Sequence, residues 1–258
     1  MNRIQDLVSD LVPAPAFAID FDEAVDIAGF SADRSSVAHT VFTPLHYESS
    51  YAYPLVVWLH GDCDNEQQLK RVMPLVSMQN YVAVAPRGTE PHRAGSGKVV
   101  SSDKVGYRWK QSLDHIWPAE QAVFDCIEAV QRRFHIAPSR VFLAGYADGG
   151  TMACRIGLNN PHRFAGAISL SGPLPTDHRP LRNLVDVRDL PIMLAVGRDS
   201  HRYRESHICH DLRLLHAAGM SVTLRQYPCG DDLTTKMLSD MDCWMMEQIC
   251  PSSFSHAD

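Results

Sequence analysis

The feature that most constrains the fold of this chain is a sharp turn between a short strand and a helix at Gly145–Gly150. The apolar run Arg140–Ala144 before it predicts a buried strand, and the residues that follow predict a helix. Glycines two residues before and two residues after an apex permit a tight reversal of the backbone. Gly145 and Gly149 occupy those places, and the apex residue is Ala147. The hexapeptide therefore indicates a fold in which a strand leads directly into a helix.

Short apolar runs alternate with helical patterns from about residue 36 to residue 250. Strands are expected at Val37–Thr43, Pro54–His60, Tyr81–Pro86, Arg140–Gly145, Ala165–Ser171, Pro191–Gly197 and Ser221–Tyr227. Helices are expected at Glu66–Met78, Pro118–Phe134, Asp148–Asn159, about Arg204–Ala218, and Leu233–Cys250. The alternation predicts an α/β fold: a mostly parallel, twisted sheet of about seven to eight strands, with helices on both faces, in a single domain.

Three segments fall outside this regular pattern. Residues 1–35 show no strong period and are expected to form an N-terminal arm, either extended or folded back, before a domain spanning residues 36–250. Residues 251–258 are expected to be a frayed tail. The segment Thr89–Gln111 is rich in Gly, Ser and Lys, and predicts a surface loop.

Asp64 followed by Gln67 predicts a capping box for the first helix.

Composition excludes several classes of protein. An apolar content of 45% and a charged content of 21% are ordinary for a soluble globular chain of 258 residues. A net charge of −6 argues against nucleic-acid binding, and the short basic cluster Arg202–Arg204 is interpreted as a solvated face. Nowhere do 18 apolar residues run together, so no membrane span is expected.

The seven cysteines are scattered singly, without a C-x-x-C pair, which favours a reducing compartment over a disulfide framework. Acidic residues interrupt the apolar stretch near the N-terminus, so a secretory signal peptide is not expected. Together these features predict a cytoplasmic protein.

An ordered series of motifs resembles the phospholipase/carboxylesterase branch of the α/β-hydrolase superfamily over about residues 36–250. The series comprises Leu55–Gly61, Val84–Gly88, Gly106–Trp109, the turn at Gly145–Gly150, Asn160–Ala167 and Ser171-Gly172. The resemblance implies an α/β-hydrolase fold in which the turn is a nucleophile elbow. In active relatives a Ser-His-Asp triad performs acyl transfer at this place.

The resemblance assigns each triad position to one residue of this chain. The serine place is Ala147, and a methyl group cannot attack a carbonyl. The acid place is Asp199, directly after the strand Pro191–Gly197. The histidine place, in the turn after the last strand, is Asp231. Two of the three triad members are therefore replaced.

The resemblance also locates the oxyanion-hole positions. One backbone N–H would come from Asp148, directly after the apex, and the second from the loop that begins at Asp62. This loop is rich in glycine in relatives, but here it reads Asp62-Cys63-Asp64, and carboxylates oppose a developing negative charge. A laboratory Ser→Ala substitution would have left the other positions intact, so their joint loss favours natural disuse.

Replacement chemistry has few candidates. Asp148 as a nucleophile would put Tyr146 where a small residue is needed, and a helix N-terminal acid is the simpler interpretation. Cys63 and Cys229 are flanked by acids, which raise a thiol pKa. His207 and His210, one helical step apart, lack a recognised zinc spacing.

The fold would bring Asp199 and Asp231 together, with Asp62, Asp148 and Asp232 nearby. Such carboxylates need a counter-charge, which Arg198 could supply. A less favoured alternative is a site for Ca²⁺ or Mg²⁺ at Asp199 and Asp231, since both ions prefer oxygen ligands. No cofactor is otherwise expected.

Three hypotheses about function follow. The favoured one is a catalytically inactive homologue of a carboxylesterase, retained as a module that binds a small apolar or acyl ligand or a protein partner. The second is a carboxylic-ester hydrolase that uses non-standard residues. The third is a subunit of a larger assembly, a homo-oligomer included, with residues 1–35 as the contact element.

Overall fold

The computed structural model describes residues 37–92, 105–178, 181 and 184–250. The strands are β1 (His39–Phe42), β2 (Tyr53–Leu59), β3 (Val82–Pro86), β4 (Glu90–His92), β5 (Gly106–Arg108), β6 (Ile136–Tyr146), β7 (Gly166–Leu170), β8 (Ile192–Gly197) and β9 (Val222–Tyr227). The α-helices are α1 (Gln68–Val76), α2 (Leu113–Gln131), α3 (Asp148–Asn159), α4 (Leu184–Val187), α5 (Glu205–Ala217) and α6 (Thr235–Ile249), and a 3-10 turn spans Pro161–Arg163. The predicted arm and tail lie outside the described residues.

Seven strands form one sheet in the order β1-β3-β2-β6-β7-β8-β9. β1 pairs antiparallel with β3, and all the other neighbours in this sheet are parallel. The predicted α/β fold, a mostly parallel seven-stranded sheet in a single domain, is confirmed. Within the described residues, no helix is both long and apolar enough to cross a membrane.

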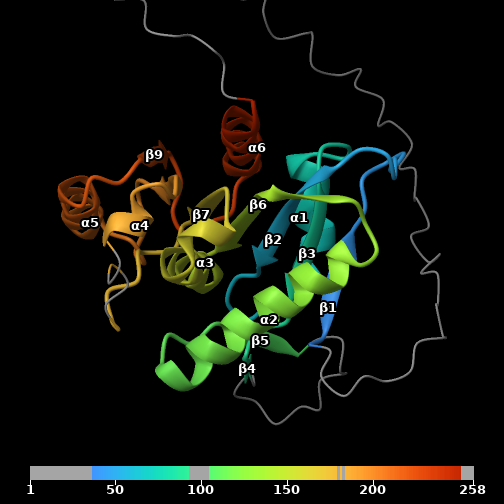
Figure 1. Cartoon of the computed structure of the whole chain (residues 1–258). Helices are drawn as coiled ribbons and strands as arrows, with labels where there is room; N and C mark the ends of the chain where they lie inside the picture. The colour runs from blue at the N-terminus through green and yellow to red at the C-terminus, as the bar shows by residue number, and fades with distance from the viewer. Residues whose placement is uncertain (1–36, 93–104, 179–180, 182–183, 251–258) are drawn as a thin grey trace, which may run out of the picture. The chain divides into compact units, whose positions relative to one another are not determined.

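Successive residues of the central strands enter opposite halves of the core. Val57 packs in a cluster with residues of α2 and α3, whereas Val56 packs in a second cluster with residues of α1 and α6. Leu194 joins a third cluster with residues of α3 and α5. The helices therefore cover both faces of the sheet (Figure 1). This alternation explains why the strands read as continuously apolar, because both of their faces are buried.

Three local predictions were wrong. α2 begins at Leu113, so Pro118 lies inside the helix rather than at its start, at the cost of one backbone hydrogen bond. The predicted capping box is absent: Asp64 accepts hydrogen bonds from the Asn65 N–H and the Gln68 side chain instead. The two ends of the predicted loop Thr89–Gln111 form a two-stranded antiparallel ribbon of β4 and β5, while its residues 93–104 lie outside the described part of the chain.

Candidate functional site

The turn between β6 and α3 has the strained backbone of a nucleophile elbow. Ala147 has φ 53° and ψ −122°, a conformation that residues other than glycine rarely adopt. A Cβ atom on Gly149 would lie 2.3 Å from the Leu59 carbonyl oxygen, so only glycine fits there. The Ala147 N–H donates to the Leu170 carbonyl at 2.8 Å, which fixes the apex against β7. The elbow's backbone is therefore retained although its nucleophile is absent.

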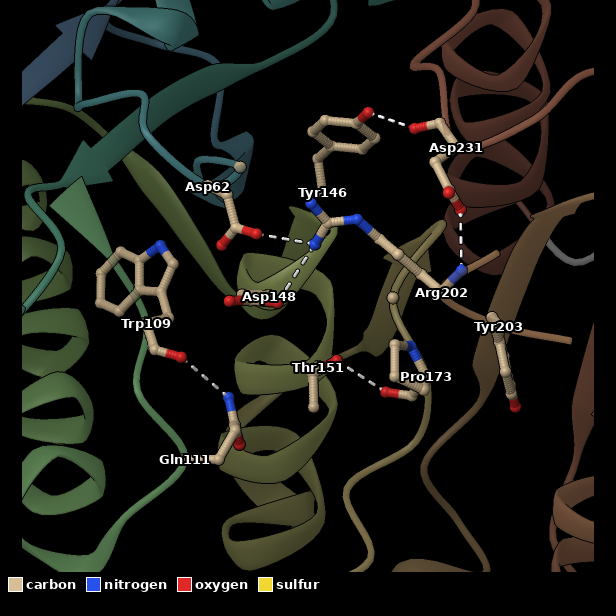
Figure 2. A network of polar contacts seen from close by, with 12 residues as sticks. Asp62, Trp109, Gln111, Tyr146, Asp148, Thr151, Pro173, Arg202, Tyr203 and Asp231 are labelled. Carbon is tan, nitrogen blue, oxygen red and sulfur yellow. Dashed lines mark hydrogen bonds and ion pairs between the residues drawn. The ribbon is translucent and has the colours of Figure 1, made fainter. Parts of the chain in front are cut away.

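A guanidinium group lies between the two residues assigned to the oxyanion hole. The Nη1 atom of Arg202 donates to Asp62 Oδ2 at 2.7 Å and to Asp148 Oδ1 at 3.4 Å (Figure 2). Asp62 follows the end of β2, and Asp148 is the first residue of α3. Arg202 is exposed, as expected for a solvated face, but its charge is also paired with both carboxylates.

The two carboxyl groups titrate as a pair. Burial, together with the hydrogen bond and negative charge of Asp62, raises the pKa of Asp148 to about 7. Burial also acts to raise the pKa of Asp62, but hydrogen bonds from Asp148 and Arg202 outweigh it and lower that pKa. The Oδ1 atom of Asp62 is buried and has no donor while both groups are ionised. Below about pH 7, burial and the negative charge of Asp62 therefore favour a proton on Asp148.

Asp231, which the sequence resemblance assigns to the place of the triad histidine, holds the loop that carries Arg202. Its carboxylate accepts hydrogen bonds from Ser200 Oγ at 2.5 Å, the His201 N–H at 3.2 Å and the Arg202 N–H at 3.3 Å. The Asp231 carbonyl accepts from the hydroxyl of Tyr146, which precedes the elbow apex (Figure 2). Asp231 thus fixes the backbone of Arg202, and Arg202 in turn joins Asp62 to Asp148. We call these four residues the elbow network.

Asp199, at the place of the triad acid, does not join the elbow network. Its side chain is 66% exposed, and its nearest cation is the Nε atom of Arg198 at 3.6 Å. Asp199 and Asp231 were predicted to lie together, but the two carboxylates have different partners and share none of them. Within the described ranges, no group of three or more His, Cys, Asp or Glu residues is arranged to hold a metal ion. The described side chains therefore give the cation hypothesis no support.

His60 is buried beneath the loop that carries Asp62, and it is not available as a base. Its Nδ1 donates to the Gly61 carbonyl at 2.8 Å, and its Nε2 accepts from the Gly88 N–H at 3.0 Å. Burial lowers its pKa, and the bond to Gly88 requires an unprotonated Nε2. The Trp109 indole also donates to the His60 carbonyl at 3.0 Å. His60 is a neutral support for the oxyanion loop.

The other nucleophile and metal-ligand candidates lie in ordinary settings. Burial raises the pKa of the Cys229 thiol, and the nearby charge of Asp232 adds to this, as the flanking acids predicted. Cys63 is an exposed residue with φ 59°. His207 and His210 are both exposed on α5. None of these four residues lies in the elbow network.

Sequence reasoning missed the central residue of this site. Arg202 meets partners that are 140 and 54 residues away in the chain, and its own neighbourhood is polar and exposed. The sequence contains only an indirect signal, because several acids assigned to one site indicate that a cation lies nearby. Arg198 was the residue considered, whereas the arginine four residues later supplies it.

A family model described as phospholipase/carboxylesterase matches residues 46–245. A probable carboxylesterase SOBER1-like from Arabidopsis thaliana is 23% identical, over 88% of this chain and 90% of that protein. The putative esterase NocK of Nocardia uniformis subsp. tsuyamanensis is 28% identical over 48% of this chain, which spans only 34% of that relative. The structure of the Bacillus cereus carboxylesterase superimposes with a TM-score of 0.64 at 15% identity, over 83% of this chain and 96% of that one. The last likeness concerns the fold alone.

Proposed function

We propose that this chain, which belongs to the phospholipase/carboxylesterase family, is a catalytically inactive homologue retained as a binding or interaction module. The single observation that carries the proposal is the elbow network: Arg202 lies between Asp62 and Asp148, and Asp231 holds its loop. The positions expected to activate a nucleophile and to receive an oxyanion are each hydrogen-bonded to Arg202 instead.

The chemistry of hydrolysis requires groups that this arrangement lacks. Ala147 offers no nucleophile, and Asp231, whose carboxylate accepts three hydrogen bonds, cannot replace a neutral imidazole as the base. An entering ester carbonyl would also meet two carboxyl groups already paired with Arg202, in place of the glycine-rich loop that supplies a free backbone N–H in relatives. The fold and the shape of a pocket do not depend on the serine, so a small apolar or acyl ligand remains the ligand class we propose.

The alternative is an ester hydrolase with non-standard residues, and one observation favours it. The strained apex at Ala147 is retained, and backbone strain of this kind commonly persists where it serves function. Binding and oxyanion stabilisation alone leave on the order of 10³–10⁴-fold catalysis in enzymes that have lost a triad. A role as a subunit of a larger assembly through residues 1–35, and a cytoplasmic location, also remain proposals.

The test is a panel of p-nitrophenyl esters with acyl chains of increasing length, assayed at high protein concentration. We expect the unaltered chain to match a heat-denatured sample on every ester. The Asp148→Asn variant serves as the control, because residual activity that depends on the carboxyl pair would disappear in it. If the unaltered chain hydrolyses an ester and the Asp148→Asn variant does not, the result would favour an ester hydrolase with non-standard residues.

Restoring the nucleophile alone should not restore catalysis. We expect Ala147→Ser to remain inactive, because the position expected to supply its base is Asp231. The double substitution Ala147→Ser with Asp231→His is the fairer revival test, although Arg202 and Asp62 still occupy the oxyanion region. Turnover from the single substitution, measured on the same ester panel, would mean that the base has been assigned to the wrong residue.

A further inference from the structure

Helix α3 carries one arginine, which is buried and lies outside the elbow network. Arg155 lies two turns beyond Asp148 and is only 2% exposed. Its Nε donates to Gln111 Oε1 at 2.8 Å, and its Nη1 donates to the Asp177 carbonyl at 2.6 Å. Both acceptors are neutral, and no described carboxylate forms an ion pair with this guanidinium. A full positive charge is therefore buried against neutral groups.

The cost of burying the charge of Arg155 is only partly compensated by its neighbours. Burial lowers the pKa of Arg155, and the negative charge of Asp177, whose residue is exposed, offsets this only in part. A guanidinium has five N–H donors, and the described residues account for two hydrogen bonds from this one. Because buried charges are normally paired, this guanidinium favours an anionic acceptor beyond the two neutral ones.

Arg155 lines an open cavity of about 360 Å³ beside α2 and α3. Three of its lining residues, Arg155, Asn159 and Asn160, come from the second half of α3 and the residue that follows it. The start of α2 contributes two apolar side chains, Leu113 and Ile116. One wall thus offers a cation with amide groups, and the other offers aliphatic surface.

We propose that this cavity binds a small aliphatic monocarboxylate. The carboxylate pairs with Arg155, whose planar donor array matches two carboxylate oxygens. The aliphatic part of the ligand lies against Leu113 and Ile116, where it removes apolar surface from water. Glu120, one turn beyond Ile116, lines the same cavity, so a second negative charge on the ligand would be repelled. His178 completes the lining and leaves the entrance polar.

Calorimetric titration of the full chain with three probes tests the ligand class. We expect butanoate to bind. Inorganic phosphate should not bind, because it adds negative charge near Glu120, and butylamine should not bind, because it places a cation at Arg155. Tighter binding of phosphate than of butanoate, or no heat with butanoate, would overturn the proposal. The outcome does not depend on whether the elbow is catalytic, because the cavity's lining includes no residue of the elbow network.

Two charge-changing variants locate the site without removing the buried arginine. Glu120→Gln removes a repulsive charge, so butanoate should bind severalfold more tightly to it. Asn159→Asp adds a negative charge at an exposed position, so binding should weaken about tenfold, or 1.4 kcal/mol.

The matched control is Gln131→Glu. It makes the same change of charge at the last residue of another helix, in the lining of a different cavity. This variant should bind butanoate like the unaltered chain. Equal weakening in Asn159→Asp and Gln131→Glu would show a general charge effect and would overturn the assignment to this cavity.

Discussion

Arg202 and Arg155 both lie at helix α3, and they are stabilised in different ways. Arg202 is 39% exposed in its side chain and is paired with two carboxylates. Arg155 is buried, and its hydrogen-bond acceptors are neutral. At the start of the helix, the positive charge of Arg202 is therefore compensated by neighbouring carboxylates. Farther along the same helix, the charge of Arg155 has no such partner among the described carboxylates. The proposed carboxylate ligand would supply one.

The largest expected effect concerns the buried arginine. Arg155→Ala should lower the free energy of unfolding by about 3 kcal/mol, because it removes two charge-assisted hydrogen bonds and opens a cavity. Arg155→Met fills most of that volume and removes the cost of burying a charge, so it should lower the value by only about 1 kcal/mol. Urea denaturation measures both. Equal losses would contradict the view that this charge is incompletely compensated.

A pH-dependent effect is expected from Asp148. Its pKa rises from 3.8 in the unfolded chain to about 7 in the folded one, so the folded state keeps a proton that the unfolded state releases. The stability contributed by this group therefore falls as pH rises from about 4 to about 7. The lowered pKa of Asp62 has the opposite effect on stability: its contribution is lost as the pH falls below 3.8.

Asp148→Asn removes this dependence. Relative to the unaltered chain, the variant should gain about 1 kcal/mol between pH 5 and pH 8, a value reduced for the 41% exposure of the carboxyl group. Denaturation at the two pH values measures the gain, and Asp199→Asn is the control at an exposed acid outside the network. A gain of the same size in both variants would refute the assignment to Asp148.

The smallest effect is expected from Arg202. Arg202→Met should cost about 0.5 to 1 kcal/mol at pH 8, because the pair is partly exposed and screened by water. The cost should shrink when Asp148→Asn is also present, since one of the two partners is then neutral. A double-mutant cycle measures this coupling. Strictly additive effects would mean that Arg202 and Asp148 do not interact in solution.

Much of the scaffold could be predicted from the sequence because local patterns determine it. All seven strands of the main sheet fall within a few residues of the expected runs, and α3 has the predicted bounds Asp148–Asn159. The glycines at 145 and 149 identified the elbow, since close backbone approach leaves no room for a side chain there. The start of α2 was missed because Pro118 looked like a first helical residue, whereas tertiary packing tolerates it inside the helix.

The site was less predictable, because long-range contacts determine it. The pattern assigned Ala147, Asp231 and Asp199 to their places, but it could not show that Asp231 binds a loop while Asp199 faces solvent. Nothing near Arg202 in the sequence marks it as the partner of two acids. Arg155 lies within a helix segment that is otherwise apolar or small, and an isolated charge in such a segment is the kind of signal that could have been noticed.

The most direct test of the central claim, that the replaced positions form one ionic network at the elbow, is a carbon-13 NMR titration of the aspartate carboxyl groups. The account predicts one carboxyl with a midpoint near pH 7, absent from Asp148→Asn and shifted upward in Arg202→Met, where a neighbouring positive charge has been removed. A titration in which every aspartate has a midpoint below pH 5, unchanged by Arg202→Met, would contradict it.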